Sequence, residues 1–183
     1  MRDDQKKMWE IHPEIWKTES AYMSWIRGGI RRYLWAKNPV KLEFIKQNRI
    51  RIPNPNTRGK VKEVWGGVCA LTGGAYPIGD MEVDHIIGNH SLKSLDDLQS
   101  FIEGIVMVSF NDLQLVSKEA HKIKSYAEKY GITFEQAKKQ KEFILISKSS
   151  ELVIDTLKTY GVPLPSTQKA RKELLKELML GEK

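Results

Sequence analysis

Residues 80–87 read Asp-Met-Glu-Val-Asp-His-Ile-Ile. This stretch, which contains the pair Asp84-His85, decides the fold. Apolar and polar residues alternate along it, the pattern of a strand that is buried on one face. Residues 65–74, Trp-Gly-Gly-Val-Cys-Ala-Leu-Thr-Gly-Gly, predict a second short strand. The Gly/Pro-rich turn between the two stretches predicts a β-hairpin. Five apolar residues are the candidates to hold this hairpin by packing: Val68, Leu71, Val83, Ile86 and Leu115.

Capping residues and helical periodicity predict helices on both sides of this hairpin. Ser94 begins one helix, with Asp97 in the reach-back position of a capping box. Ser117 and Thr133 cap two more, and Gly131 lies between them in a C-cap position. The Pro- and Asn-rich stretch 49–60 predicts a loop or linker. Helices are predicted over residues 18–37, 39–47, 94–107, 118–130, 133–146 and 150–160, and from Ser166 or Thr167 onward.

Length and composition restrict the class of protein. The chain has 183 residues, about one domain, and 40% of them are apolar, enough to bury a core. Its single cysteine, Cys69, excludes an internal disulfide framework and a cysteine-only zinc site. The first residues lack the apolar region of a secretory signal, and no apolar run approaches the roughly 18 residues of a membrane span. These features predict a cytoplasmic protein without a membrane partner.

The net charge of +7 is unevenly distributed. Residues 1–62 carry +9, residues 63–116 carry −7 and residues 117–183 carry +5. Basic surfaces attract nucleic-acid phosphates, whereas an acidic pocket can hold a divalent cation. Each charged segment is also compatible with a plain solvated surface.

Three short stretches bring together residue types that carry chemistry. They are Val83-Asp-His-Ile86, Asn111-Asp-Leu-Gln-Leu115 and His121-Lys-Ile-Lys124. Asp84 and His85 end a predicted strand, and His121 lies one turn into a predicted helix. One carboxylate and two imidazoles can therefore converge at the end of a hairpin that is followed by a helix.

These stretches resemble the HNH family of endonucleases, whose ββα-metal core places Asp-His, a Leu-Gln-Leu segment and a histidine-bearing helix in this order. Residues 18–32, Thr-Glu-Ser-Ala-Tyr-Met-Ser-Trp-Ile-Arg-Gly-Gly-Ile-Arg-Arg, look like the N-terminal segment of a phage-encoded branch. Residues 121–137 look like its C-terminal extension, so the resemblance covers roughly residues 18–148. It implies an α+β fold with a small ββα-metal core and helical extensions at both ends. The expected division is a basic helical segment and linker (1–62), the nuclease core (63–131) and a helical extension (132–183).

The resemblance implies roles for five residues. His85 would be the general base, because a neutral imidazole can deprotonate water near neutral pH. Asp84 and His121 would hold one divalent cation, Mg²⁺ with Mn²⁺ as the alternative. The family's middle residue orients the histidine and its loop, and is typically asparagine immediately before Leu-Gln. Here Asp112 occupies that position and Asn111 precedes it, so both residues are candidates.

The chain departs from the family at the structural zinc that many HNH proteins bind through two Cys-x-x-Cys pairs. The first pair would be Cys69 and Thr72, and the second Ser117 and Ala120. Because three of the four thiolates are missing, no structural zinc is expected. Cys69 is then predicted to be a small buried apolar residue.

The predicted partner is double-stranded DNA. Arginines and lysines on the flanking basic segments are the candidate contacts: Arg27, Arg31, Arg32, Lys60, Lys122 and Lys124. His90 is interpreted as a loop residue, although its spacing from His85 would let it approach a metal or phosphate. Trp25, Trp35 and Trp65 are expected in the core.

The hypothesis that follows is a Mg²⁺-dependent DNA endonuclease that leaves a 5′ phosphate and a 3′ hydroxyl. Its setting would be a phage-infected host cell or another mobile element, with homing as one role. A first alternative is a non-catalytic DNA-binding protein that retains the HNH fold. A second is a helical adaptor whose basic segments bind acidic protein partners.

Overall fold

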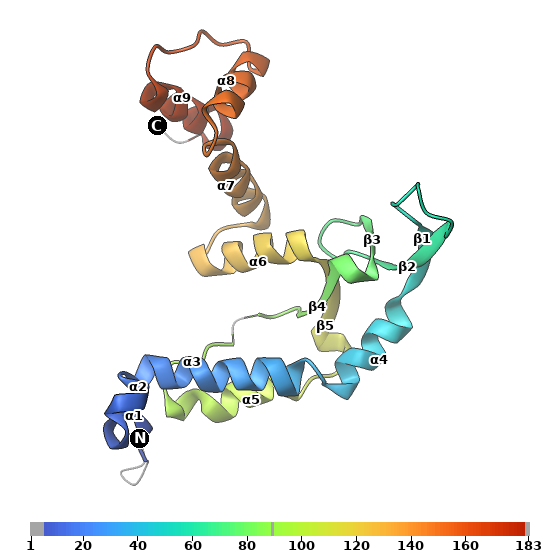
Figure 1. Ribbon diagram of the computed structural model, residues 1–183, viewed down its shortest axis with the longest axis vertical. Helices are drawn as coiled ribbons and strands as arrows, with labels where there is room; N and C mark the ends of the chain where they lie inside the picture. Colours follow the sequence, from blue (N-terminus) through green and yellow to red (C-terminus); the bar gives the residue numbers. More distant parts are fainter. Residues whose placement is uncertain (1–5, 89, 182–183) are drawn as a thin grey trace. The chain divides into compact units, whose positions relative to one another are not determined.

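The computed structural model describes residues 6–88 and 90–181, in which helices are combined with small antiparallel sheets (Figure 1). The predicted α+β class is confirmed. The chain divides into two compact units, Met1–Ala120 and His121–Lys183. Each unit buries apolar side chains of its own.

The first unit begins with a series of helices. They are α1 (Met8–Ile11), α2 (Pro13–Trp16), α3 (Glu19–Gly29), the π-helix η1 (Ile30–Trp35) and α4 (Pro39–Asn48). Thr18 caps α3 by accepting a hydrogen bond from the backbone N–H of Ala21. The predicted helix 18–37 therefore exists, but its second half widens to π-helical hydrogen bonding. Pro39 occupies the first turn of α4, as predicted.

The strands form two sheets in the described part of the chain. Strands β1 (Ile50–Pro53), β2 (Glu63–Val68) and β3 (Ala75–Pro77) form one antiparallel sheet in the order β1-β2-β3. Strand β4 (Met81–His85) pairs instead with β5 (Leu113–Ser117). The short helix η2 (Ile78–Asp80) lies between β3 and β4.

Two sequence predictions are wrong here. The stretches 65–74 and 80–87 do not pair with each other, because both edges of β2 are taken by β1 and β3. Strand β4 finds its apolar partners in β5, where Val83 faces Leu115 and His85 faces Leu113. The stretch 49–60 is not all loop, since β1 lies within it and buries Ile52.

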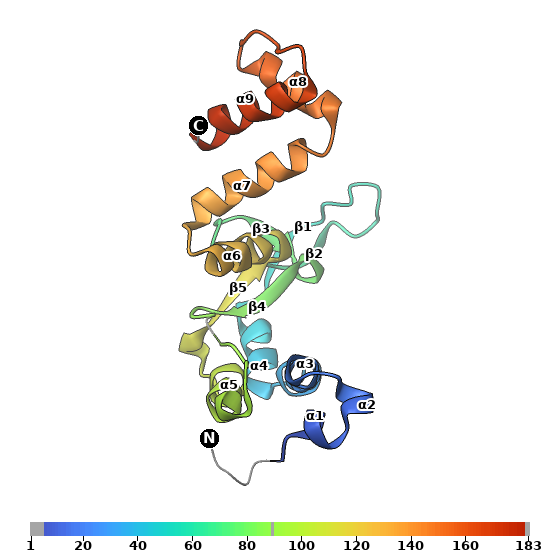
Figure 2. The same ribbon diagram turned by 90° about the vertical axis from the view of Figure 1, so that its left-hand side faces the viewer.

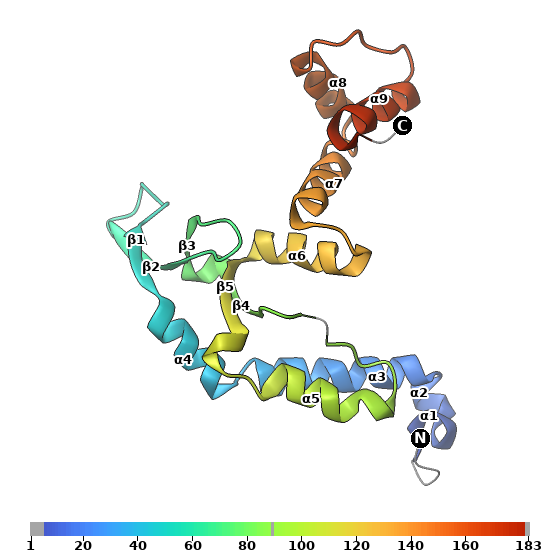
Figure 3. The same ribbon diagram turned by 180° about the vertical axis from the view of Figure 1, so that it is seen from behind.

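A helical insertion separates β4 from β5. It contains η3 (Leu95–Asp97), α5 (Leu98–Val106) and η4 (Phe110–Asp112). The predicted capping box is confirmed, because Asp97 accepts from the backbone N–H of Ser94 at 2.8 Å. Helix α5 lies alongside α3 (Figures 1 and 3). The two are held by a cluster of buried apolar side chains: Met23, Ile30, Leu92, Phe101 and Ile105.

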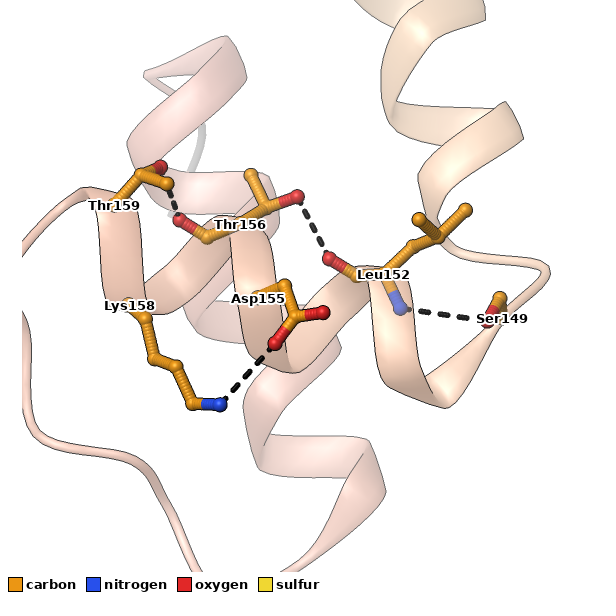
Figure 4. A network of polar contacts seen from close by, with 6 residues as sticks. All are labelled: Ser149, Leu152, Asp155, Thr156, Lys158 and Thr159. Carbon is orange, nitrogen blue, oxygen red and sulfur yellow. Dashed lines mark hydrogen bonds and ion pairs between the residues drawn. The ribbon is translucent and has the colours of Figure 1, made fainter.

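Strand β5 leads directly into α6 (Lys118–Tyr130), and the boundary between the two units falls within this helix. The second unit continues with α7 (Phe134–Ile146), α8 (Ser150–Thr159) and α9 (Gln168–Leu180). Thr133 caps α7, as predicted, and the structure adds a capping box with Gln136. Ser149 caps α8, and its hydroxyl accepts from Leu152 N at 3.3 Å (Figure 4). Helices α8 and α9 bury Val153, Leu157 and Leu175 between them.

Several residues expected in the core are exposed instead. Val68 and Ile86 are about half exposed, while Val83 and Leu115 are buried as predicted. Trp25 and Trp65 are 56% and 40% exposed, so they are not core residues. The reason is strand alternation for Trp65, which lies on the outer face of β2. No helix in the described ranges is long and apolar enough to cross a membrane.

Candidate functional site

His85 is held on two sides at the end of β4. The residue is buried, with 8% of its surface exposed. Its ring lies against that of Trp35, with the ring centroids 4.3 Å apart and the planes inclined by 32°. Its Nε2 lies 3.2 Å from the carbonyl oxygen of Ile105 on α5. The imidazole is therefore oriented by an aromatic face and by a hydrogen bond.

The contact with Ile105 assigns the proton on the neutral imidazole. A carbonyl oxygen only accepts hydrogen bonds, so Nε2 of His85 carries the hydrogen and donates. The basic lone pair of the neutral ring then lies on Nδ1. Ile105 is in the last turn of α5, where carbonyls have no partner within the helix. His85 thus also caps the C-terminal end of α5.

The next carbonyl of α5 is capped by Asn38. Its Nδ2 donates to the carbonyl oxygen of Val106 at 2.8 Å, and its Oδ1 accepts from Val40 N at 2.9 Å. Asn38 is 4% exposed. One side chain therefore joins the beginning of α4 to the end of α5, beside the carbonyl that His85 contacts.

A cation lies over the ring that supports His85. The ammonium of Lys41 is 4.7 Å from the centroid of the Trp35 ring. Burial lowers the pKa of Lys41 below its ordinary value, and the nearby carboxylate of Glu82 opposes this shift. Trp35 is the last residue of the π-helix η1.

Asp112 closes the loop that precedes β5. Its Oδ2 accepts from the backbone N–H and from the hydroxyl of Ser109, each at 2.7 Å. Its carbonyl oxygen accepts from Ile86 N at 2.9 Å, directly after His85. The bonds from the Ser109 backbone and hydroxyl hold the pKa of Asp112 below its ordinary value, and His85 adds to this lowering. Asn111 is exposed and takes no part in this capping box.

His85 and Asp112 border a pocket of about 280 Å³. It is lined by residues from β4, α5 and the connecting loops, including His85, His90, Glu103, Met107, Asn111 and Asp112. The ring of His90 lies edge-on to that of His85, with the centroids 5.5 Å apart. His90 also packs against Gly104, where a Cβ atom would overlap its imidazole. The pocket can hold a small polar group beside two imidazoles.

Sequence reasoning missed part of this pocket. His90 is a loop residue as interpreted, but its ring also lines the pocket with His85. Glu103 received no role, yet it lines the same pocket. Gly104 was the available signal in the sequence for the contact with His90. A glycine inside a helix lowers helix stability, so its presence there indicates that another group approaches the backbone closely.

The expected cation ligands, Asp84 and His121, are not among the residues that line this pocket. Asp84 is buried, and its Oδ2 accepts from Nε2 of Gln114 on the facing strand at 3.0 Å. Neighbouring residues of a strand point to opposite faces, so Asp84 and His85 leave β4 on opposite sides. His121 lies on α6 and is the first residue of the second unit. Within residues 6–88 and 90–181, no group of three or more His, Cys, Asp or Glu is placed to hold a metal.

The four positions of the expected zinc pattern lie in the first unit. Cys69 is fully buried, as predicted, and its Sγ accepts from the backbone N–H of Ser117 at 3.3 Å. Thr72 closes a turn on the carbonyl oxygen of Cys69, with its N–H 3.3 Å away. The backbone N–H of Ala120 donates to the hydroxyl of Ser117 at 3.2 Å. Hydrogen bonds thus connect all four positions.

The candidate DNA contacts are distributed over several elements. On α3, Arg27 donates to the hydroxyl of Ser24 at 3.0 Å. The guanidinium of Arg31 lies 6.0 Å from the Phe101 ring centroid, and burial followed by the charge of Arg27 lowers the pKa of Arg31. Three further candidates are exposed: Arg32 on η1, Lys60 in the β1–β2 loop and Lys122 on α6. The side chain of Lys124 is 13% exposed, and its Nζ lies 3.3 Å from Oε1 of Glu128.

Comparisons with protein-family models, with curated proteins and with solved structures gave no match.

Proposed function

We propose that the chain is a divalent-cation-dependent DNA endonuclease in which His85 is the general base. The observation that carries the proposal is the 3.2 Å contact between Nε2 of His85 and the carbonyl oxygen of Ile105. It leaves the basic lone pair of the neutral ring on Nδ1, the form in which an imidazole takes a proton from water. The ring also borders a pocket large enough for a phosphate group.

The order of the elements supports this proposal. His85 ends β4, Asp112 directly precedes β5, and α6 follows β5 without a break. Strand, strand and helix in this order are what the resemblance to HNH nucleases implies. The hydrogen bonds that connect Cys69, Thr72, Ser117 and Ala120 add support, because these are the positions of the family's zinc ligands.

We assign the middle position of the motif to Asp112 and not to Asn111. The side chain of Asp112 closes the loop on Ser109, and its backbone carbonyl holds Ile86 beside the histidine. Its negative charge also favours the imidazolium that forms when His85 takes a proton. Asn111 is exposed at the pocket, where it could contact the substrate.

The cation would be held by Asp84 and His121, as the resemblance assigns. Asp84 supplies carboxylate oxygens, which suit Mg²⁺ or Mn²⁺, and Gln114 fixes their orientation. The side chain leaves β4 on the side opposite to His85 and does not line the pocket. A bound cation would offset negative charge on the phosphate and stabilise the leaving 3′ oxygen. His121 is assigned from the sequence, and its substitution by alanine tests the assignment.

The burial of His85 favours a second candidate function. The contacts of His85 with Ile105 and Trp35 would equally serve a purely structural cap, and the residue is only 8% exposed. On this alternative the chain is a DNA-binding protein that retains the fold without cutting. Both candidates bind DNA, so cleavage separates them.

The deciding experiment incubates the purified protein with supercoiled plasmid in Mg²⁺, in Mn²⁺ and in EDTA. We expect cation-dependent nicking that falls by about 10²–10⁴-fold in His85→Ala. His12→Ala is the matched control, because His12 is paired with Glu14 on α2 and lies outside the pocket. Intact plasmid under all conditions, together with retained DNA binding, would refute the nuclease and leave the second candidate.

The resemblance to a phage-encoded branch extends the proposal to homing. A cleavage map on the DNA that flanks the gene tests this role. A preferred cut site in the corresponding uninterrupted DNA is the expected result, and uniform cleavage would speak against homing.

A further inference from the structure

Two arginines stack on one tryptophan on the outer face of β1 and β2. The Cζ atoms of Arg49 and Arg51 lie 4.2 Å and 4.3 Å from the ring centroid of Trp65. Arg51 and Trp65 face each other across the strand pair. All three side chains are exposed. These contacts join residues of two strands and hold two cations against one aromatic ring.

The opposite face of the strand pair fixes this orientation. Ile52 is 6% exposed and packs against Gly66, where a Cβ atom would overlap its side chain. Since successive residues of a strand point to opposite faces, burying Ile52 directs Arg51 outward. The arginine face is therefore presented to solvent by the packing of β1.

Most of the charge around this face is positive, and the one acid of strands β1 and β2, Glu63, lies on the same face of β2 as Trp65. From residue 44 to residue 79 the only acid is Glu63. The basic residues in the same range are Arg49, Arg51, Arg58, Lys60 and Lys62, together with Lys46, which pairs with Glu43 on α4. Within the described ranges, neither Arg49 nor Arg51 forms an ion pair with a carboxylate. Their positive charge is therefore available to an anionic partner.

The loop that joins β1 to β2 carries three further cations and is internally braced. Nδ2 of Asn54 donates to the carbonyl oxygen of Val61 at 2.8 Å, and Oδ1 of Asn54 accepts from Asn56 N at 2.9 Å. The loop projects beyond the strands of its sheet (Figure 2). Arg58, Lys60 and Lys62 thus extend the basic surface past the arginine–tryptophan stack.

Stacked guanidiniums are well suited to phosphate. A guanidinium that lies over an aromatic ring keeps its N–H donors directed sideways, in a fork that matches phosphate oxygens. Stacking also limits side-chain rotation, so less entropy is lost on binding. Because guanidiniums lie against the Trp65 ring, phosphate contact is favoured over stacking of a base on that ring.

We propose that Arg49, Trp65 and Arg51, together with the basic β1–β2 loop, form a contact surface for the phosphate backbone of duplex DNA. This inference rests on the proposed function, since the DNA bound here would be the substrate. It assigns a role to residues beyond the pocket and gives Trp65 the task of positioning two arginines.

The test measures binding of the full chain to a labelled DNA duplex in EDTA, so that cleavage cannot interfere. In Arg49→Ala/Arg51→Ala we expect the affinity for DNA to fall about 10–100-fold at low salt. We also expect the slope of the logarithm of the association constant against the logarithm of the salt concentration to become less steep by about 2. The control Lys158→Ala/Lys169→Ala removes the same charge from two exposed lysines. Lys158 on α8 pairs with Asp155 (Figure 4), and Lys169 on α9 pairs with Glu173. We expect the control to keep the wild-type slope.

A second variant separates positioning from charge. Trp65→Leu keeps both arginines, so we expect the slope to stay within about 0.5 of wild type while affinity falls by about 3–10-fold. Wild-type affinity and slope in the arginine variant, or a preference for single-stranded over duplex DNA, would overturn the inference. Plasmid cleavage is read separately in Mg²⁺. If the arginine variant binds DNA more weakly but the wild-type protein does not cleave plasmid, the nuclease proposal is refuted and this inference stands. If the wild-type protein cleaves plasmid but the arginine variant binds DNA as tightly as wild type, this inference alone is refuted.

Discussion

The buried sulfur of Cys69 accepts a hydrogen bond from the backbone N–H of Ser117, although the two residues are 48 positions apart in sequence. This bond joins the turn after β2 to the end of β5. A second bond, from Ala70 N to the carbonyl oxygen of Leu115 at 2.8 Å, strengthens the same junction. One bond to the thiol and one backbone bond therefore connect the three-stranded sheet to the β4–β5 pair.

This junction predicts that a zinc site can be restored. The triple variant Thr72→Cys/Ser117→Cys/Ala120→Cys would place four thiolates at positions that hydrogen bonds already connect. We expect it to bind one zinc ion per chain and to gain about 3 kcal/mol of unfolding free energy when free zinc exceeds the dissociation constant about a hundredfold. Metal analysis and thermal unfolding with and without zinc measure both effects. The double variant without Ala120→Cys is the control, and equal zinc content in the two would contradict the predicted geometry.

Asn38 has two tasks that single substitutions can separate. Asn38→Asp retains an oxygen that accepts from Val40 N, but it cannot donate to the carbonyl oxygen of Val106. We expect it to lower the free energy of unfolding by about 1–3 kcal/mol, because a buried carbonyl loses its partner and meets a carboxylate. Urea denaturation measures the loss. Thr167→Asp supplies the comparison at an exposed cap of α9, where little change is expected.

Gly104 and His90 are predicted to be coupled. Gly104→Ala gains up to about 1 kcal/mol of helix propensity, but its Cβ overlaps the His90 ring, which costs about 1–3 kcal/mol. We expect the single variant to be destabilised, and the same substitution in a His90→Ala background to be stabilising. Chemical denaturation of the four proteins of this double-mutant cycle gives the coupling. An equal effect in both backgrounds would show that His90 does not pack on α5.

The capping carboxylates predict a loss of stability in acid. Hydrogen bonds from Ser94 and Ser109, first of all from their backbone N–H groups, hold the pKa values of Asp97 and Asp112 below the ordinary aspartate value. A carboxylate whose folded pKa is lowered contributes stability above its unfolded pKa of about 3.9 and loses it as the pH falls through the folded pKa. Asp112→Asn should therefore be less stable than wild type at pH 7, with the difference shrinking below about pH 4. A difference that stays constant from neutral to acidic pH would contradict the ionic cap.

Local features of this fold could be predicted from sequence, while pairings between distant segments could not. The capping box at Ser94 and the cap at Thr133 were predictable because the capping partners lie three residues away. The pairing of β4 with β5 was not, because turn signals favoured the adjacent stretch 65–74 and only the full sheet shows that β2 is already paired on both edges.

The same limit applies to the candidate site. His85 was singled out from its neighbours in sequence, yet its contacts with Trp35 and Ile105 come from a π-helical turn and from the end of α5. Trp65 was assigned to the core as a large aromatic residue, but its place on an outer strand face exposes it to two arginines. Such contacts depend on register and helix ends, which residue type alone does not determine.

The insertion of residues 86–112 between β4 and β5 has a consequence for how the chain folds. A strand pair joined by a tight turn can form within microseconds, whereas these strands must first close a long loop at an entropic cost. Helix α5 has local capping boxes before and after it, so it can form early and shorten the span that remains to be closed. Because His85 meets Ile105 only once α5 has docked beside β4, the histidine acquires its orientation late, with the last tertiary contacts of the folding reaction.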